Sequence, residues 1–391
     1  MPGVSRPARG SLVDRALRRI ALEWQVQKHY NQYYLMHLQG PLRAAIISYL
    51  GQLSDGGKGV SIGDLKALLI PPIFPSDHGN GREQGGGVDD NRGGEQLHIE
   101  DEPPSPSTLN EDFRYLDLSG SVGQLLSIKE LSDLLFPGGA VGSLSKARGN
   151  IKRTNNGKEQ QEEDAGLLES WDLPGVSSPP RALLPNLTHL SLALDPDRHG
   201  QASWRQLLAF ASHLPMLTHL RLAYWPEPTL TPNAKLTTVV SPEGRRFQYG
   251  GTGFYSHTLD NDWAEAVLLV RKLSKALYGL EYLDLTGCVS WFPALMNRVD
   301  NDQVDWAGDW GKITTLVLTY SHGHEGSADD DQSHQTDDPE DVVRELRAAD
   351  VAQRTKAADT AKEIEQHIRQ QRAGQGRFIT VEYDRDPGRK R

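Results

Sequence analysis

The sequence predicts an α/β protein built from repeated strand–helix units, and three observations lead to this prediction. A pattern with large apolar residues at its first, fourth and sixth positions recurs five times along the chain. Two pairs of copies begin 30 and 33 residues apart (187 to 217 and 280 to 313), which is enough chain for one strand and one helix. Segments between the copies have apolar residues at three-to-four spacing, which is typical of helices that cover a sheet.

The clearest copy runs from Leu280 to Cys288 and reads L-E-Y-L-D-L-T-G-C. The copies begin at residues 113, 187, 217, 280 and 313. The 63 residues between the third and fourth starts correspond to two units, one of which has lost the pattern, and the longer first interval contains an insertion. The intervening helices are expected at 123–136, 203–213 and 262–277.

These copies resemble the strand segment of the leucine-rich repeat, which reads L-x-x-L-x-L-x-x-N/C. The resemblance is to the cysteine-containing type found in F-box proteins, and it implies a solenoid with a parallel concave sheet and outer helices. It also implies that Cys288, at the ninth position, is a buried structural thiol. An ordinary α/β domain whose buried parallel strands share this spacing is the alternative.

The third and fifth residues of each copy should face away from the core, because side chains alternate along a strand. In the resemblance, this outward face is the partner-binding surface. His189 and His219, from consecutive copies, are expected to stack side by side. We predict that a protein partner binds this face together with Trp225 from the aromatic segment that follows the third copy. The predicted contact residues are Tyr115, Asp117, His189, His219, Arg221, Trp225, Tyr282 and Asp284.

The sequence carries no pattern that predicts catalysis, a metal or a cofactor. Two adjacent imidazoles fall short of the three or four ligands that a zinc site uses. A catalytic role for Cys288 would require a histidine partner and a depressed pKa. The glycine cluster at 250–253 has no strand before it and no helix after it, so it is a poor phosphate site. We therefore expect an interaction scaffold rather than an enzyme.

Composition limits the class of protein further. The chain has 391 residues, one cysteine and a formal net charge of -10. One cysteine excludes a disulfide framework, and the negative charge argues against nucleic-acid binding. No apolar stretch approaches the ~18 residues of a membrane span, so no membrane partner is expected. We expect a protein of the cytoplasm or nucleus; a basic N-terminal helix leaves a mitochondrial presequence as the alternative.

Shifts in composition predict the organisation of the chain. Residues 1–75 have helical spacing, with a break at Gly40-Pro41 and a short helix capped by Ser61. The glycine- and proline-rich stretches are expected to be disordered, since they contain few apolar residues. The predicted parts are a helical region (1–75), a disordered linker (76–110), the repeat domain (111–322), an acidic linker (323–340), and a charged helix, short strand and basic tail (341–391). The repeat domain should contain a disordered insertion at 138–180 and an aromatic one at 225–263, which either packs on the repeats or exposes a binding hot spot.

Residues 42–50 resemble the first helix of an F-box, L-x-x-x-I-x-x-Y-L, although Pro41 directly precedes Leu42 and no Val-Cys…Trp continuation follows. The resemblance implies a substrate receptor of cullin-RING ubiquitin ligases as the alternative function. The residues that would contact the ligase linker subunit are Leu42, Ile46, Tyr49 and Leu50.

Overall fold

The computed structural model describes Pro2, Val4 and residues 6–53, 59–72, 105–137, 182–196, 202–230, 237–240, 246–249, 263–298, 303–320 and 340–384. The linker and insertion expected at 76–110 and 138–180 lie outside these ranges, apart from 105–110. The acidic linker expected at 323–340 lies outside them apart from its last residue.

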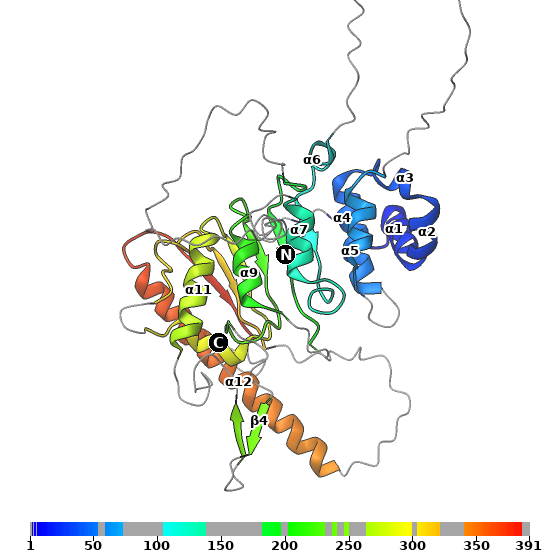
Figure 1. Ribbon diagram of the computed structural model, residues 1–391. Coiled ribbons are helices and arrows are strands. Elements are labelled where there is room, and N and C mark those ends of the chain that lie inside the picture. Colours follow the sequence, from blue (N-terminus) through cyan, green and yellow to red (C-terminus); the bar gives the residue numbers. More distant parts are fainter. Residues whose placement is uncertain are drawn as a thin grey trace, which may run out of the picture.

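A six-stranded parallel sheet is the centre of the structure (Figure 1). Its strands follow one another in chain order, so each repeat adds a strand beside the previous one. They are β1 (Tyr115–Asp117), β2 (His189–Ser191), β3 (His219–Arg221), β6 (Tyr282–Asp284), β7 (Thr315–Val317) and β8 (Thr380–Glu382). The first five are the five sequence copies, and β8 is the strand expected near the C-terminus. The α/β class and the parallel sheet are confirmed.

The strands pair without a shift in register, so equivalent positions of the repeat lie side by side. The central leucines form one buried row that Val381 extends: Leu116, Leu190, Leu220, Leu283 and Leu316. Burying each leucine side chain contributes about 1.5–3 kcal/mol. Backbone pairing continues beyond the strands. In four copies, the N–H of the eighth residue donates to the carbonyl of the seventh residue of the next copy at 2.8–2.9 Å.

Helices cover one face of this sheet (Figure 1). α7 (Ile128–Leu135), α9 (Trp204–Ala211) and α11 (Ala264–Ala276) lie side by side in chain order, followed by the 3₁₀ helix η2 (Val289–Leu295). α7 begins five residues later than the sequence predicts, because Ser127 and Glu130 form a capping box that fixes its start. A hairpin of β4 (Thr237–Val240) and β5 (Arg246–Tyr249) lies within the aromatic insertion.

The N-terminal helices close the β1 edge of the sheet. They are α1 (Leu12–Leu22), α2 (Trp24–Tyr30), α3 (Gln32–Leu35), α4 (Gly40–Leu53) and α5 (Ile62–Leu69), followed by the short α6 (Pro106–Leu109). α4 packs on β1, and α5 packs on α7. The predicted cap at Ser61 is confirmed as a capping box with Asp64. These helices share one hydrophobic core with the sheet.

The opposite end of the sheet is closed by α12 (Glu340–Gln371) and β8. The second half of α12 packs on η2 and β8 through a buried seam of Ala357, Ala361, Ile364 and Ile368. The second half of this charged helix therefore packs back on the repeats. Within the described ranges, no helix has both the length and the apolar character needed to cross a bilayer.

A buried arginine lies at each end of the sheet. Arg43 of α4 donates to the carbonyls of Leu68 and Leu109 and to Asn110 Oδ1. Arg372, just after α12, donates to the carbonyls of Trp306, Trp310 and Ile313 at 2.7–2.8 Å. Burial lowers the pKa of both guanidinium groups. Each arginine thus satisfies buried carbonyls at helix ends or in the turn before β7 that would otherwise lack a donor.

Replacing Arg372 should destabilise the protein strongly. Arg372→Met keeps the length of the side chain but leaves three buried carbonyls without a donor, so we expect a loss of about 3 kcal/mol in the free energy of unfolding. The matched control is Arg369→Met, because Arg369 is largely exposed and its ion pair is with Glu365 on the same helix. Urea unfolding measures both. Equal losses in the two variants would contradict the role given to Arg372.

Candidate functional site

Two rows of side chains run across the face of the sheet opposite the helices. The register places the third positions of the repeats in one row and the fifth positions in the other. The third-position row is Tyr115, His189, His219, Tyr282, Thr315 and Thr380. The fifth-position row is Asp117, Ser191, Arg221, Asp284, Val317 and Glu382. The structure therefore brings together seven of the eight residues that the sequence predicts for this face.

The predicted stack of His189 and His219 is confirmed, with ring centroids 4.0 Å apart and planes inclined by 15°. Tyr282 continues the stack at 5.6 Å from His219. The hydroxyls of Thr188 and Thr218 each donate to a carbonyl of the preceding repeat, so they accept from the Nδ1–H of the following histidine at 2.8–2.9 Å. Both imidazoles are thereby held in one orientation.

Both stacked histidines favour the neutral form. Burial lowers the pKa of His219 to about 4, and the adjacent His189 adds to the shift. Burial also lowers the pKa of His189, although the nearby Pro2 carbonyl opposes this. Two cationic rings at 4.0 Å would repel each other, so the stack disfavours protonation of both imidazoles at once.

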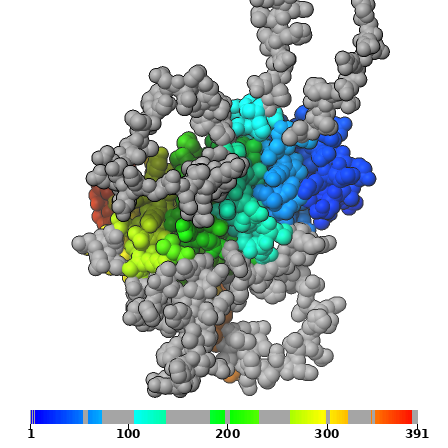
Figure 2. Space-filling model, viewed as in Figure 1, coloured from blue at the N-terminus to red at the C-terminus, as the bar shows by residue number. Residues whose placement is uncertain are grey.

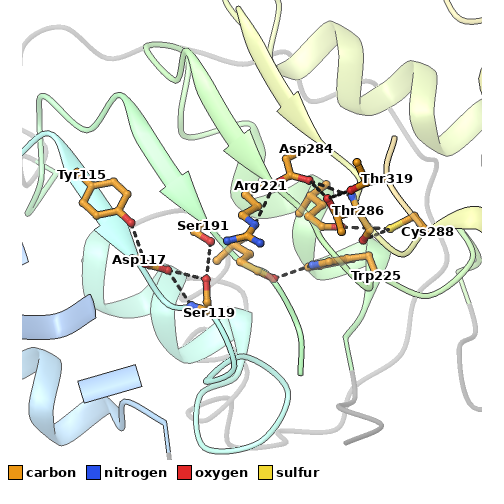
Figure 3. Close-up of polar contacts among 12 residues, drawn as sticks. Tyr115, Asp117, Ser119, Ser191, Arg221, Trp225, Asp284, Thr286, Cys288 and Thr319 are labelled. Atoms are coloured by element: carbon orange, nitrogen blue, oxygen red, sulfur yellow. Dashed lines mark hydrogen bonds and ion pairs between the residues drawn. The ribbon is translucent and has the colours of Figure 1, made fainter. Parts of the chain in front are cut away.

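Asp117 is the most densely bonded carboxylate on this face (Figure 3). Its Oδ1 accepts from the N–H and hydroxyl of Ser119, and its Oδ2 accepts from Ser48, Tyr115 and Arg6. These hydrogen bonds hold the pKa of Asp117 below its usual value against the opposing effect of burial. The sequence did not point to Arg6 or Ser48, which lie 111 and 69 residues away along the chain.

Asp284 repeats this arrangement three strands further along the sheet. Its Oδ1 accepts from the N–H and hydroxyl of Thr286, as Asp117 does from Ser119. Its cation is Arg221 of the neighbouring strand β3, at 2.9 Å. Gly287, which follows Thr286, has a φ of 75° and leaves no room for a Cβ beside the ring of Tyr224. The Asp-Leu-Ser/Thr-Gly motif therefore forms the same turn in both repeats, in which the aspartate accepts from the N–H and hydroxyl of the residue two positions later.

In two of the copies, the ninth residue ties the copy to the preceding one. The Cys288 thiol donates to the carbonyl of Leu222 at 3.2 Å, and Trp225 Nε1 donates to the equivalent carbonyl of Leu192 at 2.8 Å. Both side chains are buried, and burial raises the pKa of the Cys288 thiol. The structural thiol implied by the repeat resemblance agrees with this burial.

The prediction that Trp225 contacts a partner is wrong. Its side chain is only 2% exposed, and its N–H is already used inside the chain. The sequence contained a signal for this burial. Trp225 is the ninth residue of its copy, and Cys288, which was expected to be buried, is the ninth residue of the clearest copy. Trp263, at the other end of the aromatic insertion, is also buried. Of the remaining aromatic residues of that insertion, Phe247 and Tyr249 belong to β5, and Phe254 and Tyr255 lie outside the described part of the chain.

Four other predicted contacts are less accessible than expected. Tyr115, Asp117, Tyr282 and Asp284 are at most 9% exposed, because neighbouring strands pack their side chains tightly and Arg6 covers β1. His189, His219 and Arg221 are partly exposed. A partner would therefore meet the two histidines and Arg221 first, with the carboxylates beneath.

The residues predicted to contact a ubiquitin-ligase linker lie in the core of this chain. Ile46, Tyr49 and Leu50 are buried, Leu42 is partly buried, and the Tyr49 hydroxyl donates to Asp14 of α1. Their faces are covered by α1 and β1, so the predicted contact is not accessible in this structure.

Comparisons of the chain with protein-family models, curated proteins and solved structures found no match. Among the described residues, no group of three or more His, Cys, Asp or Glu side chains is placed to hold a metal ion.

The hydrogen bond of Trp225 should contribute measurably to stability. Trp225→Phe removes the N–H and leaves the Leu192 carbonyl without that donor, at a cost of about 1–2 kcal/mol beyond the loss of ring packing. Trp310→Phe is the matched control, because the buried Trp310 Nε1 makes no hydrogen bond within the described ranges. Denaturant unfolding of both variants gives the difference, and equal losses would contradict the assignment.

Stability should fall as the pH falls from about 6.5 to about 4. An unfolded histidine takes up a proton near pH 6.5, whereas folded His219 resists protonation down to about pH 4. The unfolded state therefore binds more protons in this window and gains stability as the pH drops. His219→Gln should flatten the pH dependence of the urea midpoint, while His29→Gln on exposed α2 should not. Identical slopes in all three proteins would contradict the shift.

Proposed function

We propose that this protein is a leucine-rich-repeat scaffold without catalytic activity, which binds a protein partner on the strand face that carries His189, His219 and Arg221. The observation that carries this proposal is the ordered pair of rows on that face. The histidines are held in one orientation by Thr188 and Thr218, and they remain partly exposed. Arginine is favoured at interface hot spots, and side chains that are already held in place, as the histidines are by threonines and Arg221 is by Asp284, lose little conformational entropy on binding.

The repeat identity is supported by the strand order, by the unshifted register and by the ninth-position bonds of Trp225 and Cys288. A ubiquitin-ligase receptor, the alternative function, has less support, since three of its four assigned contact residues are buried. The single cysteine, a buried thiol, fits a reducing compartment such as the cytoplasm or nucleus.

A bulky substitution on the strand face tests this function. Thr315 is partly exposed at the third position of β7 and pairs with Tyr282 rather than with either aspartate, so Thr315→Arg obstructs the surface while leaving the Asp117 and Asp284 clusters intact. Arg221 is unsuitable, because Arg221→Glu would place a second carboxylate beside the buried Asp284. The control is Gln206→Arg on the exposed side of α9.

Tagged full-length proteins would be purified from cells and their co-purifying proteins quantified by mass spectrometry. We expect the main partner to be reduced about tenfold by Thr315→Arg, which corresponds to about 1.4 kcal/mol of binding, and to be unchanged by Gln206→Arg. Retention of every partner by Thr315→Arg would overturn the strand-face proposal.

A further inference from the structure

The carboxylate of Asp117 is paired with an arginine that does not belong to the sheet. Arg6 Nη2 donates to Asp117 Oδ2 at 3.0 Å and to the Tyr115 hydroxyl at 2.5 Å, and the Tyr115 hydroxyl in turn donates to Asp117. The guanidinium also lies 5.4 Å from the centre of the Tyr115 ring. One guanidinium thus meets a carboxylate, a phenol oxygen and an aromatic ring, which is a combination suited to arginine.

Asp284 shows what this site would contain if the sheet continued. The cation of Asp284 is Arg221, supplied by the adjacent strand on the β1 side. β1 is the first strand, so no earlier strand can supply a cation to Asp117. A carboxylate as buried as Asp117 requires a partner charge, because desolvation without one is costly. Asp117 therefore forms a prebuilt guanidinium site at the edge of the sheet, and Arg6 occupies it.

The segment that supplies Arg6 lies outside the regular secondary structure and is partly exposed. Arg6 precedes α1, belongs to no helix or strand, and keeps 43% of its side chain exposed. Val4 packs on the core, and the Pro2 carbonyl lies near His189. The segment thus lies over β1 and β2, beside the histidines of the proposed partner face. Such an exposed tether can exchange with an equivalent segment of another molecule.

The charges on this face favour a basic ligand. The fifth-position row contains three carboxylates, Asp117, Asp284 and Glu382, against one arginine, Arg221. Arg221 is already paired with Asp284, whereas Glu382 is exposed. Complementary charge speeds association and selects the partner.

We propose that Asp117 and Tyr115 form a guanidinium-binding site, that Arg6 is its intramolecular ligand, and that the partner inserts an arginine from a basic, extended segment in place of Arg6. This inference rests on the proposed function, because it names the chemistry of the partner that the strand face accepts. It also assigns the N-terminal segment a role as a competitor: wild-type protein binds the partner less tightly than a protein whose own arginine is absent.

The test uses the full chain and a fluorescent peptide with the sequence of residues 2–10, which contains Arg6 and Arg9. The Arg6→Ala protein should bind this peptide about tenfold more tightly than the wild-type protein does, because the internal competitor is gone. A peptide carrying the Arg6→Ala change keeps Arg9 and should lose most of the binding. Fluorescence anisotropy measures the affinities.

A thermal-unfolding measurement covers the case in which Arg6→Ala is destabilised. The wild-type peptide should then raise the melting temperature of the variant, whereas the altered peptide should not. Equal affinity of both peptides, equal affinity of both proteins, or no binding would overturn the proposal and leave Arg6 a structural cap. Failure of the proposed function gives a different result. In that case, Thr315→Arg leaves the capture of partners unchanged, regardless of how the peptides bind.

Discussion

The unshifted parallel register of the strands is the constraint on which the rest of the structure depends. Because each strand pairs residue for residue with the next, every position of the repeat becomes a row across the sheet. The central leucines form the buried row, the histidines stack, and the ninth-position side chains reach the preceding copy. A slip of one residue would turn each strand over and expose the leucines to water.

Such a sheet has two edge strands, β1 and β8, and both edges must be covered. An open strand edge leaves backbone groups unpaired and invites association with other chains. Here α4 covers the first edge and α12 packs beside the last strand. Arg43 and Arg372 donate to buried carbonyls of the helix ends and turns that pack at these two sides, and Arg6 supplies the charge that an earlier strand would have supplied.

The strand face combines structural and exposed polar groups within one row. Asp117 and Asp284 serve mainly to fix their turns, since each accepts from the N–H and hydroxyl two residues on. The histidines between them carry no such bonds to the turns and stay partly exposed. In the proposed function, the partner therefore contacts the histidines in the middle of the face, and its arginine reaches the Asp117 carboxylate on the first strand.

The amino-acid sequence by itself determined the strands, their parallel order, the row of leucines and the histidine stack, because these follow from local spacing and from one repeated pattern. It did not determine which face residues are accessible, since Arg6 reaches Asp117 from 111 residues away. Nor did it predict that Trp225 would be buried or that α4 would turn Ile46 and Tyr49 inward. Periodicity decides which way a side chain points, whereas only the packing of distant segments decides what covers it.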